Sequence, residues 1–327
     1  MPGSIKVVLT SPRVAPGLLT RAAWQVFTDA GQIGASAGPS RPDVQALIGS
    51  GLVVQHIDGD VSEQWSWLTS AALDGSDVAW LVGEDGEPAL LRLIADELSR
   101  EPRPEYEVEI VHGSYDVPGA RLIDLVRVMD RLRRVCPWDQ EQTHQSLAKY
   151  LLEETYETLE AIDSGDYVHL REELGDLVFQ VIFHSRIAEE IDPDDDGFSI
   201  DDVAGDLVEK LIRRHPHVFA GVPVADAAAV EANWESIKAT EKQRTSVLEG
   251  IPLALPALAL ADKVLGRAAK VLPDGLPTVE ATDEDARIGQ LLLDLVRQAR
   301  AVGVDPEQAL RTATHRLADQ IRTAETG

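Results

Sequence analysis

The pattern of apolar and polar positions divides the chain into three segments, of which the first alternates strands with helices. Apolar runs and polar–apolar alternation predict strands, while apolar positions three and four apart predict helices. The predicted strands lie at 5–9, 78–82 and 106–111, and the predicted helices lie at 19–30 and 88–98. Strands separated by helices of this length are typical of a small α/β domain with a mostly parallel sheet, which we place at residues 1–117.

The second segment, residues 118–243, is almost wholly helical. Its clearest run, spaced i, i+3, i+4, i+7 and i+8, consists of Leu174, Leu177, Val178, Val181 and Ile182. Phe179 and Phe183 add apolar surface on a second side, so we expect this helix to be buried on more than one face, in a tight bundle or a helical dimer interface. The acidic stretch 191–197 is expected to form the loop that follows. The predicted fold is therefore mostly α, a helical bundle preceded by a small α/β domain.

The third segment, residues 244–327, is also helical and contains a possible internal repeat. Residues 286–291 can be aligned with residues 172–177, and both stretches continue as amphipathic helices. Two acids of the first stretch are replaced in the second by Arg287 and Gln290. If the repeat is real, the second copy keeps its fold and has lost its chemistry; the alternative is a chance likeness between two helices.

The charge and composition narrow the possible partners. The chain has 56 acidic and 30 basic residues and a formal net charge of −26. Such a surface repels polynucleotides, which bind through Lys and Arg, whereas a small phosphorylated ligand needs only local basic groups. No apolar run approaches the roughly 20 residues that span a membrane, and we expect no membrane partner. The single cysteine, Cys136, excludes an intrachain disulfide and fits a cytoplasmic protein, as does the absence of a signal-peptide pattern.

Two pairs of acidic residues are the candidate chemistry. Residues three apart share a helical face, so Glu154 lies beside Glu157, and Glu173 lies beside Asp176. The 16 positions between Glu157 and Glu173 (173 − 157) allow a turn at 164–166 and an antiparallel return. Four converging carboxylates repel one another, and a divalent cation removes that cost. Oxygen ligands select Mg²⁺, with Mn²⁺ as an alternative, and bound Mg²⁺ favours phosphate oxygens as further ligands.

These residues allow other interpretations. Acids three apart also occur on any solvated helix, but Gly175 lies between them, where glycine costs about 1 kcal/mol relative to alanine and suggests close approach of a helix or ligand. A di-iron bundle needs histidine three residues after glutamate, where this chain has acids. His215 and His217 flank a proline and do not share a helical face, so we interpret them as structural rather than as zinc ligands.

Several motifs between residues 120 and 243 together resemble the MazG nucleoside triphosphate pyrophosphohydrolases. In chain order they are residues 136–139 (CPWD), 142–143 (QT), 152–157 (LEETYE), 173–177 (ELGDL), 213–219 (RRHPHVF) and 234–238 (WESIK). The resemblance implies an all-α, usually dimeric domain that hydrolyses NTP or dNTP to the monophosphate and pyrophosphate. It identifies the four acids above as Mg²⁺ ligands, and it suggests that Glu153 acts as an outer-shell base or orients a water.

The resemblance also implies contacts to the substrate. Lys210, Arg213 and Arg214 match the basic positions of the family, Lys238 is a further phosphate contact, and Trp138 either stacks on the base or anchors the core. The implied role is cytoplasmic nucleotide-pool housekeeping.

The resemblance is weaker at both ends of the chain. The last segment resembles a degenerate second copy of the domain, in which Arg316 and Asp319 stand roughly where Lys210 and Arg213 would. The first segment resembles a tetrapyrrole-methylase domain, in which residues 82–88 correspond to the cofactor loop. The acidic residues in this loop disfavour binding of S-adenosylmethionine. A nucleotide-sensing protein without turnover and a methyltransferase are therefore the rival functions.

Overall fold

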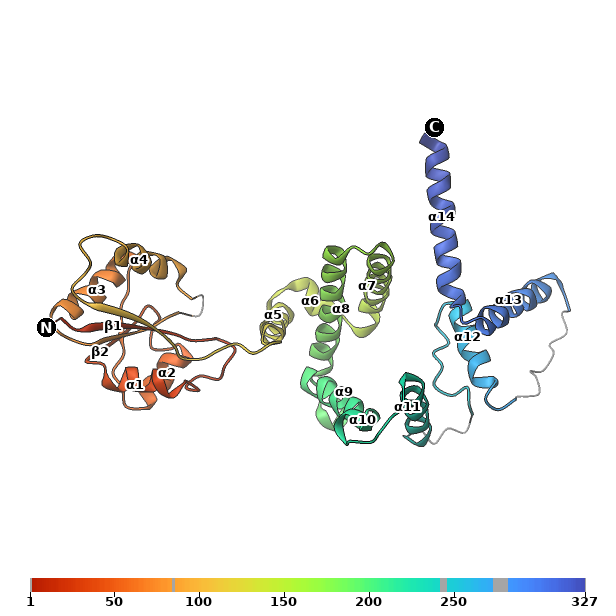
Figure 1. Ribbon diagram of the computed structural model, residues 1–327, viewed down its shortest axis with the longest axis horizontal. Coiled ribbons are helices and arrows are strands. Elements are labelled where there is room, and N and C mark those ends of the chain that lie inside the picture. The colour runs from red at the N-terminus through yellow and green to blue at the C-terminus, as the bar shows by residue number, and fades with distance from the viewer. Residues whose placement is uncertain (1, 84–85, 242–245, 273–281, 327) are drawn as a thin grey trace. The chain divides into compact units, whose positions relative to one another are not determined.

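The computed structural model describes residues 2–83, 86–241, 246–272 and 282–326. The chain forms two compact units, Met1–Ala204 and Gly205–Gly327, which are described separately (Figure 1). The domain boundaries at 117–118 and 243–244 stay predictions, and the second of them lies outside the described residues, as does part of the predicted cofactor loop, Glu84 and Asp85.

The first unit begins with the predicted α/β domain. Its parallel sheet has the order β3-β2-β4-β1-β5. The strands are β1 (Ser4–Leu9), β2 (Gln32–Ala35), β3 (Gln55–His56), β4 (Val78–Leu81) and β5 (Glu107–His112). The helices are α1 (Arg21–Asp29), α2 (Pro42–Gly49), α3 (Val61–Leu73) and α4 (Pro88–Leu98). The mostly parallel sheet is confirmed; β2, β3, α2 and α3 were not predicted individually because their apolar runs are short.

Helices cover both faces of this sheet (Figure 1). Successive strand residues point to opposite faces, so Val7 and Trp80 pack with α3 and α4, while Val8 and Leu81 pack with α1 and α2. The indole Nε1 of the fully buried Trp80 donates to Glu87 Oε2 at 2.7 Å, which satisfies the one polar group of that side chain.

The rest of the first unit is helical. It contains α5 (Arg121–Val135), α6 (Pro137–Glu141), α7 (His144–Ser164), α8 (Tyr167–Ala188), the short η1 (Pro193–Asp195) and the start of α9 (Ile200–Arg214). The predicted turn is confirmed: α7 ends at Gly165, which has a φ of 72°, and the Asp166 side chain accepts from the N–H groups of Val168 and His169 to begin α8. This turn folds α7 and α8 into a hairpin.

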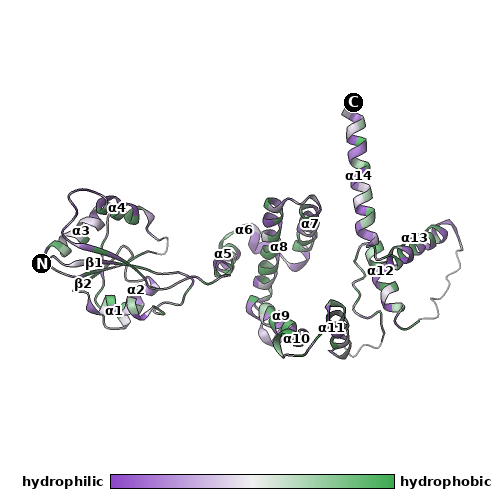
Figure 2. Cartoon of the chain, in the orientation of Figure 1, coloured by the Kyte–Doolittle hydropathy of each residue, from purple (hydrophilic) through white to green (hydrophobic). Residues whose placement is uncertain are grey.

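A small apolar core holds the hairpin against α5. Its buried side chains are Met129, Leu147, Ile182, Phe183 and Ile187. The single chain does not bury α8 on several faces, because Leu174, Val178 and Val181 stay exposed, so burial in a dimer interface stays a prediction. Figure 2 shows hydrophobic residues along α8. Around Gly175, no atom of the described chain outside the adjoining backbone of α8 lies within 4 Å of where a Cβ would be, so no helix of the same chain approaches it. Close approach of a ligand stays a prediction.

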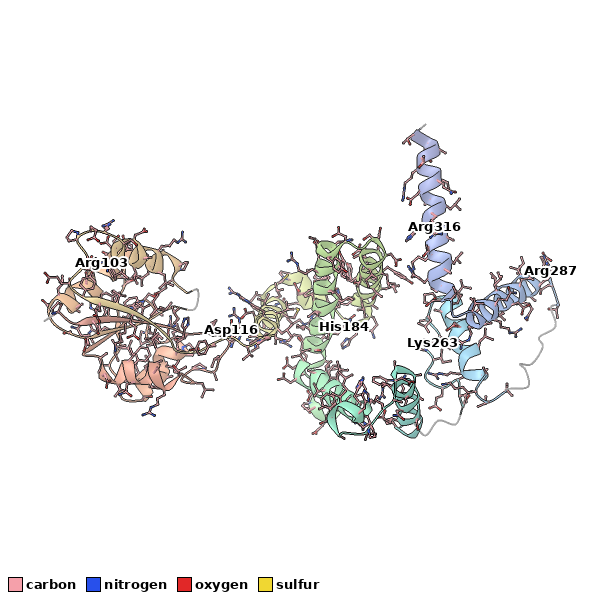
Figure 3. The ribbon with its side chains drawn as sticks, viewed as in Figure 1. Arg103, Asp116, His184, Lys263, Arg287 and Arg316 are labelled. Atoms are coloured by element: carbon pink, nitrogen blue, oxygen red, sulfur yellow. The ribbon has the colours of Figure 1, made fainter. Side chains whose placement is uncertain are left out.

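The described part of the second unit contains helices joined by loops and no strand. After the end of α9 it contains α10 (Pro216–Phe219), α11 (Ala227–Glu241), α12 (Ala257–Ala268), α13 (Glu284–Ala301) and α14 (Pro306–Thr326). Arg300 on α13 donates to Asp262 Oδ1 on α12 at 2.6 Å. The proposed repeat 286–291 lies in α13, where Figure 3 labels Arg287. Across the described ranges, no helix has the length and apolar character needed to cross a membrane.

Candidate metal centre

The hairpin brings together three of the four predicted metal ligands. Glu154 and Glu157 on α7 and Glu173 on α8 each offer a carboxylate oxygen, and these oxygens lie within 4.8 Å of one another. Ligands of one Mg²⁺ lie at most about 4.2 Å apart, twice the ion–oxygen distance, so small side-chain rotations suffice to close the set on one ion. Within the described part of the chain, no other group of three His, Cys, Asp or Glu residues brings its potential ligand atoms this close together. All three members of this group are carboxylates.

Glu173 is the innermost of these acids. It is 6% exposed, and its Oε1 lies 2.9 Å from Nε2 of His169, one helical turn earlier on α8. Its Oε2 is buried and has no hydrogen-bond partner among the described residues. A buried carboxylate oxygen without a donor is costly, and a cation is the partner that removes the cost. The residues present therefore fit a hard divalent cation.

The electrostatics of Glu154 show how tightly the acids are grouped. Its pKa is raised above the ordinary carboxyl value, first by burial and then by the charges of Asp176, Glu157, Glu173 and Glu153, in decreasing order. Asp176 thus acts on Glu154 more strongly than the other acids do, although its oxygens are outside the group of three. Its role as fourth ligand stays a prediction. Glu153 is exposed on α7 and has the weakest influence.

Trp138 lies at the edge of the hairpin core. Its ring packs edge-on against Tyr150 and Phe183, with ring centres 6.0 and 6.4 Å apart, and 48% of its surface is exposed. This packing agrees with the core-anchor interpretation, while the exposed half leaves the base-stacking prediction open.

The four predicted basic residues belong to the second unit. Arg213 Nε donates to Glu241 Oε1 at 2.7 Å, and Arg214 Nη2 donates to the other oxygen, Oε2, at 2.6 Å. These two guanidinium groups lower the pKa of Glu241 to about 2. Lys210 lies on α9, and Lys238 lies on α11. The Glu241 carboxylate therefore holds two of the four basic side chains in place. The sequence motifs did not indicate Glu241 as their partner.

An aromatic ring organises the same part of the second unit. The Arg214 guanidinium and the Lys238 ammonium lie 5.6 and 5.8 Å from the centre of the Trp234 ring. The His215 ring packs edge-on against the same ring at 4.7 Å, and its Nδ1 lies 2.7 Å from the Leu211 carbonyl oxygen. These contacts agree with a structural role for His215.

Sequence reasoning missed three polar side chains on the hairpin. His169 supports Glu173, and its spacing of four residues could have indicated it. His184 on α8, labelled in Figure 3, and His144 on α7 place their Nδ1 atoms 2.8 Å apart. No local spacing indicates that contact, because the two residues are 40 positions apart and meet only after the hairpin forms.

The profile of the MazG nucleotide pyrophosphohydrolase domain matches residues 142–219, which include the acidic cluster. A Streptomyces cacaoi protein described as "Uncharacterized 26.1 kDa protein in blaB 3'region" is 50% identical over 243 residues, covering 74% of this chain and 98% of that protein.

Two mycobacterial relatives carry a functional name, nucleoside triphosphate pyrophosphohydrolase. The Mycolicibacterium smegmatis protein is 42% identical over 274 residues, which cover 81% of this chain and 75% of that protein. The Mycobacterium tuberculosis protein is 47% identical over 207 residues, which cover 63% of this chain but only 59% of that protein.

Proposed function

Because the chain belongs to the MazG family of nucleoside triphosphate pyrophosphohydrolases, we propose that it hydrolyses NTP or dNTP to the monophosphate and pyrophosphate with Mg²⁺. Mn²⁺ is expected to substitute. The observation that carries the proposal is the buried Oε2 of Glu173, which has no partner among the described residues and belongs to one of three grouped carboxylates. A protein that only senses nucleotides has no need of such a group.

The acidic residues have distinct proposed roles. Glu154, Glu157 and Glu173 would hold the cation, Asp176 would complete the set, and Glu153 would orient the attacking water. When bound, the cation neutralises phosphate oxygens and activates water for attack on the α-phosphorus. The 2.9 Å contact between His169 and Oε1 would hold Glu173 in one rotamer and leave Oε2 for the cation.

The remaining parts of the proposal concern the phosphates and the assembly. Lys210, Arg213, Arg214 and Lys238 are the proposed contacts to the phosphate oxygens, since planar guanidinium groups match them in geometry. A homodimer is proposed because α8 leaves a row of apolar side chains exposed in the single chain. We further propose a cytoplasmic nucleotide-pool role and no polynucleotide substrate, given the net charge of −26.

The test is product analysis with a panel of NTPs and dNTPs and Mg²⁺, in which both nucleotide products and pyrophosphate are quantified. Monophosphate and pyrophosphate in equal amounts support the proposal. Diphosphate with orthophosphate would show that a different bond is cleaved. Saturable binding of nucleotide without any product would instead favour the sensing function.

A further inference from the structure

A crevice lies at the carboxyl ends of the parallel strands in the α/β domain. The strands β1 and β4 are neighbours in the sheet, and the helices that follow them go to opposite faces. One face is covered by α1 with α2, and the other face is covered by α3 with α4. Such a change of direction leaves a crevice beyond the two strands, and open α/β sheets generally bind their ligands there.

The crevice has the size of a small-molecule site. Its volume is about 540 Å³, within the roughly 300–1,000 Å³ that is typical of ligand pockets. It is lined by residues 9–13 at the end of β1, by residues 112 and 114–116 at the end of β5, by Gly86 after β4, and by Arg121, the first residue of α5. No residue of the acidic cluster lines it, so the crevice is separate from the metal centre.

Arg13 is the anchored cation of this crevice. Its side chain is largely buried but lines the cavity. Its Nη1 donates to Asp116 Oδ2 at 2.6 Å, while its Nε and Nη2 each lie 2.7 Å from Asp124 Oδ2. These contacts use three of the five N–H groups of the guanidinium and hold it in one orientation. A phosphate oxygen at the remaining N–H groups would therefore meet a donor that is already ordered.

Positive charge is in excess around the crevice. Arg121 donates to Asp124 through one Nη1 bond of 3.0 Å, and 81% of its side chain is exposed, which leaves most of its N–H groups open to a ligand. Arg127 donates to the Pro12 carbonyl at 2.7 Å. Together with Arg13, three arginines meet the two aspartates that hold Arg13, in a chain whose net charge is −26. This local excess favours an anionic ligand.

An exposed aromatic pair lies beside the arginines. His112 and Tyr115 both line the crevice, and their rings are stacked, with centres 5.6 Å apart and an angle of 23° between the planes. Tyr115 is 62% exposed, so most of its surface is open to a further ring. Planar bases stack on such exposed aromatic side chains. A ligand that matches both features carries an anionic group and a planar ring.

We propose that this crevice is a second ligand site, which binds a nucleoside monophosphate with its phosphate at Arg13 and Arg121 and its base on Tyr115. The planar guanidinium groups match the geometry of a phosphate. A monophosphate fits better than a triphosphate, because Asp116 lies beside the arginines and repels the larger negative charge. The inference does not depend on the proposed function, since guanidinium contacts and base stacking need no metal ion.

The experiment is isothermal titration calorimetry of the common nucleoside monophosphates in EDTA, which keeps metal from the acidic cluster. Wild type is compared with Arg121→Gln and Tyr115→Ala, two exposed positions of the crevice. The matched control is Arg103→Gln, an arginine of the same domain whose side chain is 82% exposed and which lies outside the crevice (Figure 3). We expect the Kd of the tightest-binding monophosphate to rise about tenfold in each crevice variant and to stay at the wild-type value in the control.

Two further measurements sharpen the test. Tyr115→Phe keeps the ring and should retain the wild-type Kd, and the nucleoside without its phosphate should bind about tenfold more weakly. Circular dichroism checks that each variant is folded. Wild type that binds no monophosphate at millimolar concentration overturns the inference, and so does an unchanged Kd in folded Arg121→Gln and Tyr115→Ala. Tighter binding of S-adenosylmethionine than of any monophosphate overturns it too, in favour of the methyltransferase.

Discussion

Replacement of Glu173 by glutamine separates a metal ligand from a structural acid, because the two roles predict opposite effects on stability. The side chain is 6% exposed, and one of its oxygens has no partner in the part of the chain that the structure describes. Glutamine keeps the shape and removes the negative charge. We therefore expect turnover to fall by two decades or more, equivalent to about 2.7 kcal/mol of transition-state stabilisation. The free energy of unfolding without metal should rise by about 1 kcal/mol, the low end of the cost of an unmatched buried group, since an amide satisfies that position only in part.

The assay measures pyrophosphate release with Mg²⁺ and thermal unfolding in EDTA. The matched control is Glu160→Gln, an exposed acid on α7 outside the acidic cluster, for which both quantities should match wild type. Mg²⁺ should raise the Tm of wild type and of the control but not that of Glu173→Gln. A Glu173→Gln protein that is less stable in EDTA and keeps its turnover would refute the reasoning, because Glu173 would then act as a structural partner of His169.

The remaining predictions concern pH, the basic residues and the last segment. Because the pKa of Glu154 is raised in the fold, the contribution of Glu154 to metal-free stability is fully present below the ordinary carboxyl pKa and is lost as pH rises through the raised value. The stabilisation by Mg²⁺, measured by Tm, should grow over that pH window, and this growth should be smaller in Glu154→Gln. Glu241→Gln should raise KM several-fold by releasing Arg213 and Arg214; unchanged KM would contradict this. The pKa of Glu241 is lowered to about 2, so its contribution to stability is fully present above the ordinary carboxyl pKa and is lost as pH falls towards 2. Wild-type KM should therefore show no change caused by titration of Glu241 near neutral pH. Arg287→Ala should leave turnover within twofold, and a large loss would assign chemistry to α13.

Local patterns in the sequence were enough to predict the hairpin and its acids. The turn expected at 164–166 is a local signal and was confirmed, with Gly165 ending α7 and Asp166 capping α8. The three-residue spacing is a second local signal, and three of the four acids it selected come together, while the place of Asp176 stays a prediction. The strand pattern at 78–82 was equally clear, because a central strand buried on both faces is continuously apolar.

Features that depend on distant parts of the chain could not be predicted in this way. The contact between His144 and His184, and that between Arg214 and Glu241, join residues far apart in sequence, and neither has a spacing rule. What covers the apolar faces of α8 could not be predicted for the same physical reason: an apolar pattern shows that a face avoids water, and it does not show whether the same chain covers that face.

The central claim is that Glu154, Glu157 and Glu173 hold one divalent cation, and anomalous diffraction from crystals grown with Mn²⁺ tests it most directly. We predict a manganese peak within about 2.5 Å of oxygens from all three side chains, a generous limit for a hard divalent cation, and no such peak in Glu173→Gln crystals. A manganese ion bound elsewhere, with these three carboxylates free of metal at saturating Mn²⁺, would contradict the account.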